Sequence, residues 1–349
     1  DPGMCSYSDK VIKSLEPENI KKMVKWNKKF TEPINDDEVV TLLRLSAAID
    51  DLWEAQINLR KEVNAKTRDS LSVFGHIDDA VDSHTTIRQK DKIFSELYKS
   101  EHMRNAGPYA RLKFAMDYWC ALWFWPIDKA DLLPTRSEFL FDMSLILVGT
   151  MASVKVTDSV KGGQMTLFPT EMEQLALDII DTYGVDTVVD IPRLRKENPR
   201  LDLAARIAEQ NHFMHWELEF ADLFAERGGF DLIIGNPPWI KIEWNEQGVL
   251  SDSNPMFAVK KLTATQTTHE RAQSLENAMT RNMYFAEYES TSGEQAFLNA
   301  VQNYPALKGQ QTNLFKCFLP LAWEKNRESG VAAFVHPEGV YDDPKGGAL

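Results

Sequence analysis

The sequence has few cysteines and no long apolar run. Its three cysteines, Cys5, Cys120 and Cys317, lie far apart, so they predict neither a disulfide framework nor a zinc knuckle and fit a reducing cytoplasm. No stretch reaches the ~18 to 20 apolar residues that cross a bilayer. The best candidate, 118–126 (YWCALWFWP), is shorter and ends at a proline. We therefore expect a cytoplasmic protein with no membrane partner.

Basic residues are in deficit across the chain. The 39 lysines and arginines face 52 aspartates and glutamates, which gives a net charge of -13. This balance excludes a chain that is basic throughout and holds nucleic acid by charge alone, but it leaves room for a local basic face. The 349 residues are 43% hydrophobic, which is enough to bury a core and predicts roughly two domains of ordinary length.

Residues 1–165 are expected to form a mainly helical region, as an insertion or accessory domain. Apolar residues recur at helical spacing between positions 20 and 52, and segments 93–98 and 110–125 continue the pattern. The aromatic residues at 118–125 could form a platform for stacking bases. Aromatic residues this dense on a helix are more often part of a core, so we favour the core.

Residues 166–349 have the pattern of an α/β catalytic domain. Alternation predicts a strand at 213–220, and the short apolar run at 230–235 (FDLIIG) predicts a buried parallel strand. A polar segment at 245–308 is interpreted as an insertion. The remaining expected elements are a connection at 159–169, helices at 171–183, 201–211 and 314–323, a turn at Gly228-Gly229, and a strand at 331–335.

The residues that carry chemistry are Asn236, Pro237, Pro238 and Trp239, directly after the apolar run. They occupy the carboxyl end of the predicted strand, where open α/β sheets bind ligands. Two prolines stiffen the loop and remove two backbone donors, so the loop offers mainly acceptors followed by a flat aromatic ring. A purely structural interpretation is a rigid turn in which Asn236 caps, the prolines stiffen and Trp239 packs.

This set of groups suits a planar amine. The Asn236 side-chain oxygen and the Pro237 carbonyl can accept both hydrogens of an exocyclic amino group, which frees the nitrogen lone pair for attack. The chemistry is positioning and electrostatic stabilisation, with no covalent intermediate and no metal. Trp239 can stack on the base, and a base in duplex DNA must first leave the helix.

The segment FDLIIGNPPW resembles the catalytic motif of amino-group methyltransferases that use S-adenosylmethionine, whose pattern is Asp/Asn-Pro-Pro-aromatic. The flanking segments 213–224 and 312–341 resemble those of large adenine-specific DNA methyltransferases, such as type IIG restriction–modification enzymes and the BREX and DISARM phage-exclusion systems. The resemblance covers roughly residues 165–349. It implies a partial Rossmann-like methyltransferase fold, with S-adenosylmethionine as the cofactor and a flipped adenine in double-stranded DNA as the partner.

Only matching positions carry over from the family. Asn236, Pro237, Pro238 and Trp239 correspond to its target-amine and stacking residues. Asp222, in ADLF, lies where the family often has an acidic residue that contacts the cofactor adenine, although a helix or turn cap explains it equally well. His212 and His215 are discounted as metal ligands, because a strand places residues three apart on opposite faces.

One expected element of the family is missing from the sequence. Residues 1–8 (DPGMCSYS) superficially resemble its glycine-rich cofactor loop but lack the glycines that permit close backbone approach. We expect that loop upstream of residue 1 and the target-recognition region downstream of residue 349. Cofactor binding by residues 1–349 alone is therefore expected to be weak or absent.

The sequence thus predicts a DNA adenine-N6 methyltransferase of restriction–modification or phage defence, with other subunits of a defence system as candidate partners. One alternative keeps the chemistry but acts on RNA or on a protein glutamine. Another is a non-catalytic DNA-binding or assembly subunit that kept the fold and lost the cofactor loop. No nuclease constellation is found, so restriction activity is not expected from this segment.

Overall fold

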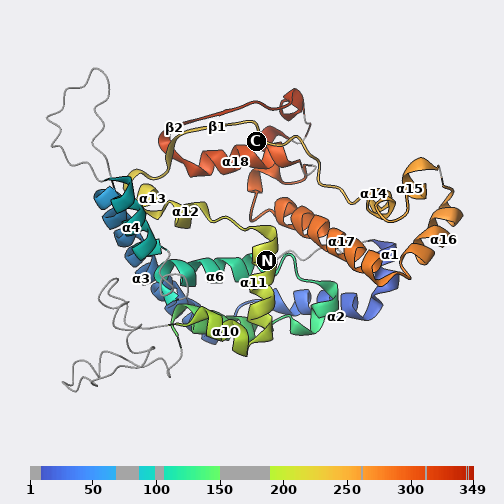
Figure 1. The fold of residues 1–349 in the computed structure, drawn as a ribbon, viewed down its shortest axis with the longest axis horizontal. Coiled ribbons are helices and arrows are strands. Elements are labelled where there is room, and N and C mark those ends of the chain that lie inside the picture. Colours follow the sequence, from blue (N-terminus) through green and yellow to red (C-terminus); the bar gives the residue numbers. More distant parts are fainter. Residues whose placement is uncertain are drawn as a thin grey trace.

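The computed structural model describes residues 9–67, 86–98, 106–149, 189–260, 262–310, 313–342, 344 and 346–349. This part of the chain is mostly helical, with one small parallel sheet of two strands (Figure 1). Within it, no helix combines the length and apolar character needed to cross a bilayer.

The helices and strands follow one another in this order: α1 (Lys10–Leu15), α2 (Pro17–Phe30), α3 (Asp36–Thr67), α4 (Ile87–Tyr98), α6 (Pro108–Ala121), η1 (Ile127–Leu132), α7 (Arg136–Leu147), α10 (Ile191–Glu197), α11 (Pro199–Asn211), α12 (Trp216–Glu219), α13 (Ala221–Arg227), β1 (Phe230–Gly235), α14 (Glu246–Ser251), α15 (Met256–Val259), α16 (Ala264–Ser274), α17 (Ala278–Asn299), η2 (Pro305–Leu307), α18 (Leu314–Lys325), β2 (Asn326–Phe334), η3 (Glu338–Val340) and η4 (Gly346–Ala348).

The core lies in the helical part of the molecule. The 32-residue helix α3 packs against α6, α7 and α13 and is labelled at the left of Figure 1. The predicted aromatic core is confirmed, since Tyr118, Trp123 and Trp125 are all nearly inaccessible to solvent. Trp119 is an exception, because it remains 36% exposed at the edge of this core.

Several predicted elements are confirmed. The segments 201–211 and 314–323 lie within α11 and α18, and the apolar run at 230–235 is β1. The run at 331–335 overlaps the second half of β2, which begins earlier, at Asn326, and ends at Phe334. Local signals explain α11, because Asn198 caps its first turn and Pro199 occupies its first position. The predicted connection at 159–169 and helix at 171–183 lie outside the described residues.

The predicted strand at 213–220 is wrong. His212 adopts a left-handed conformation (φ 52°) at the end of α11, and the chain then turns into the short helix α12. The same residues carry a competing helical spacing, since Trp216 and Phe220 are four apart and their rings stack at 6.1 Å. Both rings contact Phe230, so packing against β1 selects the helix.

The sheet pairs β1 with β2 in parallel, as expected, but the strands are not buried on both faces. Helix α18 packs against β2, whereas Leu232, Ile234 and Val331 are between 56% and 72% exposed. Because Leu232 pairs with Val331 in the register, these side chains share one face. No described element covers that face, so the prediction that β1 is buried on both faces is wrong.

The polar segment 245–308 folds into α14–α17 and η2, and part of it joins the core. Tyr284 and Tyr288 of α17 are buried in the main cluster, and Gly293 lets the helix approach Phe124 closely. Arg281 also pairs with Glu16 at 2.7 Å. Polar composition therefore coexists here with a close attachment to the N-terminal helices.

Glu289 of α17 is expected to make stability depend on pH. Its carboxylate accepts a hydrogen bond from the Ile127 backbone N–H at 2.7 Å, and burial raises its pKa from 4.5 to about 7. The folded state binds the Glu289 proton more tightly than the unfolded state does. Protonation of Glu289 therefore stabilises the fold in full below pH 4.5, and this contribution is lost as pH rises through 7. Glu289→Gln removes this loss, so the variant should exceed the wild type by about 2 kcal/mol at pH 8 and match it near pH 5.

Urea unfolding between pH 5 and 8 measures this difference. The matched control is Glu276→Gln, which neutralises an exposed carboxylate just before α17 and should leave the pH dependence of the wild type unchanged. A constant difference between Glu289→Gln and the wild type across this range would contradict the prediction.

Candidate active site

Strand β1 is positioned by a two-glycine turn and by an aromatic cluster. Gly228 (φ 73°) ends α13 in the left-handed conformation, and Gly229 (φ 143°) passes against the backbone where α18 meets β2. The Phe230 ring then lies in edge contact with Trp216, Phe220 and Phe224 at centroid distances of 5.1 to 5.9 Å. The first residue of β1 is thereby fixed relative to α12 and α13.

The loop Asn236–Trp239 leaves the carboxyl end of β1, as predicted, and is tied to β2. The Val335 N–H donates to the Gly235 carbonyl at 3.1 Å, and the Trp239 indole N–H donates to the Val335 carbonyl at 3.3 Å. One residue later, the Ile240 carbonyl accepts from the Leu314 N–H at 3.0 Å, at the start of α18. Both ends of the loop are therefore held by the next helix–strand unit.

Asn236, Pro237 and Pro238 line one cleft of about 490 Å³, and Trp239 lies outside its lining. The other wall is apolar and comes from α12, α18 and the two strands. The remaining lining residues are Trp216, Phe230, Leu232, Ile233, Ile234, Gly235, Phe318, Leu321, Ala322, Lys325 and Phe334. The cleft therefore combines a few polar groups at one end with apolar walls, which is typical of small-molecule sites.

Asn236 has a free carboxamide within the described part of the chain. Its side chain is exposed and makes no hydrogen bond to any described residue, whereas Pro237 next to it is buried. The buried proline anchors the backbone next to the exposed Asn236. Trp239 is 55% exposed, so its ring faces are accessible although its N–H is engaged.

The sequence did not predict that Lys325 and His336 lie in this region. Lys325 ends α18 and lines the cleft, and its ammonium pairs with Glu217 and with Glu324 at 2.9 Å. Burial by itself would lower the pKa of Lys325, but the hydrogen bonds that its ammonium donates to the two carboxylates outweigh this effect, and the pKa is raised above its usual value. His336 follows β2 and stacks on Phe315. Both positions depend on long-range packing that the local sequence does not signal.

Asp222 is held by helix α3. One carboxylate oxygen accepts from Arg60 Nε at 2.5 Å and the other from the Asn64 side-chain amide. The residue is 8% exposed and lies in the first turn of α13, where no side-chain cap forms. In this structure Asp222 links the N-terminal helices to the element that precedes β1.

Comparison with known proteins gives a family match to part of the chain. Residues 175–278, a segment that contains Asp222 and the loop Asn236–Trp239, match the sequence model of the family described as Eco57I restriction-modification methylase. No curated protein and no solved structure matches the chain. Together with the loop at the end of β1, the family match supports a methyltransferase of the restriction–modification type.

Proposed function

We propose that the protein is a DNA methyltransferase that transfers a methyl group from S-adenosylmethionine to adenine N6 in restriction–modification or phage defence. One observation carries the proposal. Asn236, with a free carboxamide among the described residues, lines a cleft at the carboxyl end of β1 together with Pro237 and Pro238, inside the segment matched by the methylase family.

The role of the loop follows from its acceptors. The Asn236 side-chain oxygen and the Pro237 carbonyl take the two N–H hydrogens of the target amine, so the nitrogen moves toward tetrahedral geometry and its lone pair becomes available. The rigid Pro237-Pro238 backbone holds these acceptors in place before the substrate arrives, and preorganised electrostatic groups of this kind lower the barrier. Once a base fills the cleft, its apolar walls keep water from the amine, which strengthens both hydrogen bonds.

The lining of this cleft fits the acceptor amine and does not fit the whole cofactor. S-adenosylmethionine supplies a methyl group on a positively charged sulfur and carries a ribose diol that carboxylates commonly bind. The described lining contains no carboxylate, and both oxygens of Asp222 are occupied by Arg60 and Asn64. S-adenosylmethionine is therefore proposed from the family match. For Asp222 to contact the cofactor adenine, its carboxylate would have to give up its hydrogen bonds to Arg60 and Asn64 of α3.

Adenine in duplex DNA is the proposed substrate. Its amino group is paired within the helix, so the base must flip out before the loop can reach it, at a cost of a few kcal/mol. The exposed ring of Trp239, held beside the cleft by its hydrogen bond to Val335, offers a surface on which the flipped base can stack. Stacking on an aromatic side chain contributes about 1 to 3 kcal/mol per base.

The experiment that tests the proposal supplies the full-length protein with methyl-tritiated S-adenosylmethionine and three substrates in parallel. These are duplex DNA of mixed sequence, the same sequence as RNA, and a protein release factor with a glutamine acceptor. We expect label in DNA alone, recovered as N6-methyladenine after digestion to nucleosides. Label in RNA or in the release factor instead would overturn the DNA assignment, and DNA binding without transfer to any substrate would favour a non-catalytic subunit of a defence complex.

A further inference from the structure

Helix α2 presents a face of lysines to solvent. Lys21, Lys25, Lys28 and Lys29 are all exposed, and their spacing of four, seven and eight residues places them on one side of the helix. These four residues are the lysine face. The helix contains one carboxylate, Glu18, against five lysines, whereas the whole chain has a net charge of -13. The lysine face is therefore a local basic surface of the kind that the overall charge balance left open.

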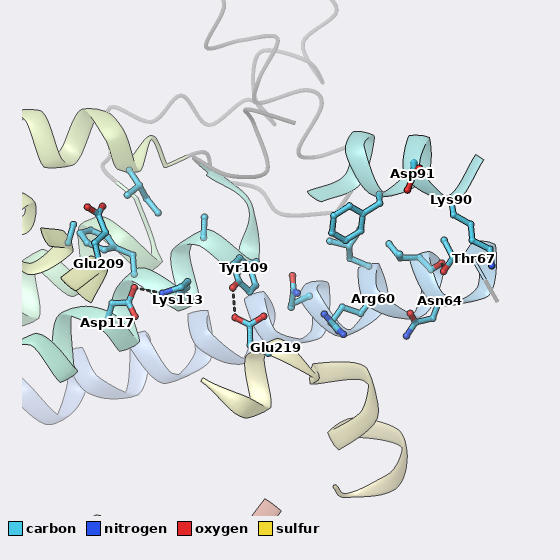
Figure 2. Close-up of a pocket in the computed structure, with 18 of the residues that line it drawn as sticks. Arg60, Asn64, Thr67, Lys90, Asp91, Tyr109, Lys113, Asp117, Glu209 and Glu219 are labelled. Carbon is cyan, nitrogen blue, oxygen red and sulfur yellow. Dashed lines mark hydrogen bonds and ion pairs between the residues drawn. The ribbon is translucent and has the colours of Figure 1, made fainter. Parts of the chain in front are cut away.

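The ammonium groups of the lysine face have no ion-pair or hydrogen-bond partner among the described residues. The fifth lysine of α2, Lys22, differs from them because it pairs with Asp131 at 2.9 Å. Figure 2 shows the paired arrangement in a cleft among the helices, where the ammonium of Lys113 meets the carboxylate of Asp117 at 2.6 Å. The lysine face thus has four positive charges that no described side chain engages.

The helix dipole accounts for only part of this face. Lys28 and Lys29 lie in the last turn of α2, where positive charge is favourable. Lys21 and Lys25 lie before that turn, and Lys25 is four residues from both Lys21 and Lys29. Like charges at this spacing destabilise a helix. An anionic partner that contacts these lysines removes the repulsion, so the arrangement favours binding to such a partner.

The rest of α2 distinguishes between a nucleic acid and a membrane. A helix that lies on a lipid surface inserts an apolar face beside its basic one. The apolar side of α2 instead faces the core, because Ile20, Met23 and Phe30 are buried there. Within this helix, which the structure describes in full, Val24 is the one large apolar side chain that is exposed. A row of ammonium groups without an apolar face beside it matches the phosphates of a nucleic acid.

We propose that the lysine face of α2 binds the phosphate backbone of duplex DNA away from the target base. The proposal rests on the DNA substrate proposed above and adds a contact that is independent of sequence. Each ammonium neutralises one phosphate and releases the counterions condensed on it, so binding through this face weakens as salt rises. The contact positions the duplex and takes no part in methyl transfer.

The lysine face is linked to the element before β1 by helix α3. Arg136 joins the two helices, since its Nη1 donates to the last carbonyl of α2 at 3.2 Å and its Nε pairs with Glu38 of α3 at 2.7 Å. Further along α3, Arg60 pairs with Asp222 of α13. Glu38 and Arg60 are about 33 Å apart at the rise of an α-helix, a span that about ten base pairs of DNA cover. A duplex of about 40 base pairs is long enough to extend beyond both ends of this span.

Binding of the full-length protein to a fluorescent 40-base-pair duplex of mixed sequence, measured by anisotropy over a range of salt concentrations, tests the proposal. The variant Lys21→Gln/Lys25→Gln removes two phosphate contacts. We expect the slope of log K against log salt to become shallower by about two, and the affinity at about 0.1 M salt to fall at least about tenfold. The variant Lys21→Arg/Lys25→Arg keeps both charges and should bind as the wild type does. Wild-type slope and affinity in the glutamine variant would overturn the proposal.

The matched control is Lys61→Gln/Lys196→Gln, which removes the same charge from exposed positions on α3 and α10. It should keep the salt slope of the wild type, and an equal loss in this control would reduce the effect to net charge. Vesicles of phosphatidylserine and phosphatidylcholine form a second arm. Binding to these vesicles that depends on Lys21 and Lys25, with DNA binding unaffected, would assign the face to a membrane and overturn the proposal.

Methyl transfer is measured separately, so that the two proposals can fail independently. In the glutamine variant of α2, kcat at saturating DNA should equal that of the wild type and KM for DNA should rise. DNA binding that depends on the lysine face, in a protein that transfers no methyl group to DNA, would refute the methyltransferase assignment and leave the lysine face as a DNA contact. Methyl transfer to DNA with a KM that the α2 substitutions do not change would do the reverse.

Discussion

Asn236→Ala should reduce methyl transfer by about 10³-fold while leaving the fold intact. The substitution removes the side-chain acceptor for one N–H of the target amine, and the loss of one preorganised polar contact at a reacting group typically costs about 10² to 10³ in rate. Stability should change by less than about 0.5 kcal/mol, because the Asn236 side chain is exposed and makes no hydrogen bond to a described residue. Single-turnover transfer to DNA, combined with urea unfolding, measures both quantities.

Asn236→Asp is the matched control for that experiment. It keeps a side-chain oxygen in the same place and follows the Asp/Asn alternative of the motif, so it should retain far more activity than the alanine variant. Turnover at the wild-type rate in Asn236→Ala would remove Asn236 from the mechanism. A loss of activity that parallels a loss of folded protein would instead assign it a structural role.

The position of the Asn-Pro-Pro-Trp loop could be predicted because its signals are local. An apolar run of strand length is followed at once by two prolines, and this order alone places Asn236 at a strand end. The rest of the cleft is not local. Leu321 and Ala322 of α18 lie more than 80 positions further along the chain and reach the cleft only because β1 and β2 pair in parallel. The far wall of the site could not be inferred from periodicity.

Asp222 shows the same limit for a single residue. The sequence left a cofactor contact and a cap equally open; the structure shows no cap, and the carboxylate instead accepts hydrogen bonds from helix α3. Its partners, Arg60 and Asn64, are separated from it by 162 and 158 positions. Pairing across such a distance depends on how α3 packs against α13, which no window of sequence encodes.

The polar composition of segment 245–308 does not reveal that part of it packs against the core. Its many glutamine, threonine and glutamate residues suggested a polar insertion, and α16 has no buried residue, in agreement with that character. In α17, however, Tyr284 and Tyr288 place one aromatic stripe in the core. These two buried rings attach the helix to the core together with the close approach at Gly293 and the Arg281–Glu16 ion pair, because buried aromatic area contributes strongly to packing.

Gly229→Ala should destabilise the protein by about 3 kcal/mol or more, the largest effect on stability expected here. The residue has φ 143°, a conformation that L side chains rarely adopt and that costs roughly 1 to 3 kcal/mol. An added Cβ would also lie 2.7 Å from the Asn326 carbonyl carbon and 2.8 Å from the Arg327 nitrogen. These are backbone atoms at the junction of α18 and β2, so relief requires β1 and β2 to separate, and displacement of the adjacent loop should reduce methyl transfer as well.

Comparison with Gly228→Ala separates the two costs expected for Gly229→Ala, the strained backbone conformation and the steric clash of the added Cβ. Gly228 also has a positive φ, 73°, but no atom lies within 4 Å of the Cβ that alanine would add. The cost should therefore be that of a left-handed alanine alone, about 1 to 2 kcal/mol. Urea unfolding of the two variants side by side measures the difference. Equal destabilisation would mean that contact with the α18–β2 junction contributes nothing and that β1 is free to shift. A clear excess for Gly229→Ala would mean that this glycine sets how closely β1 can approach the helix–strand unit that holds the Asn-Pro-Pro-Trp loop.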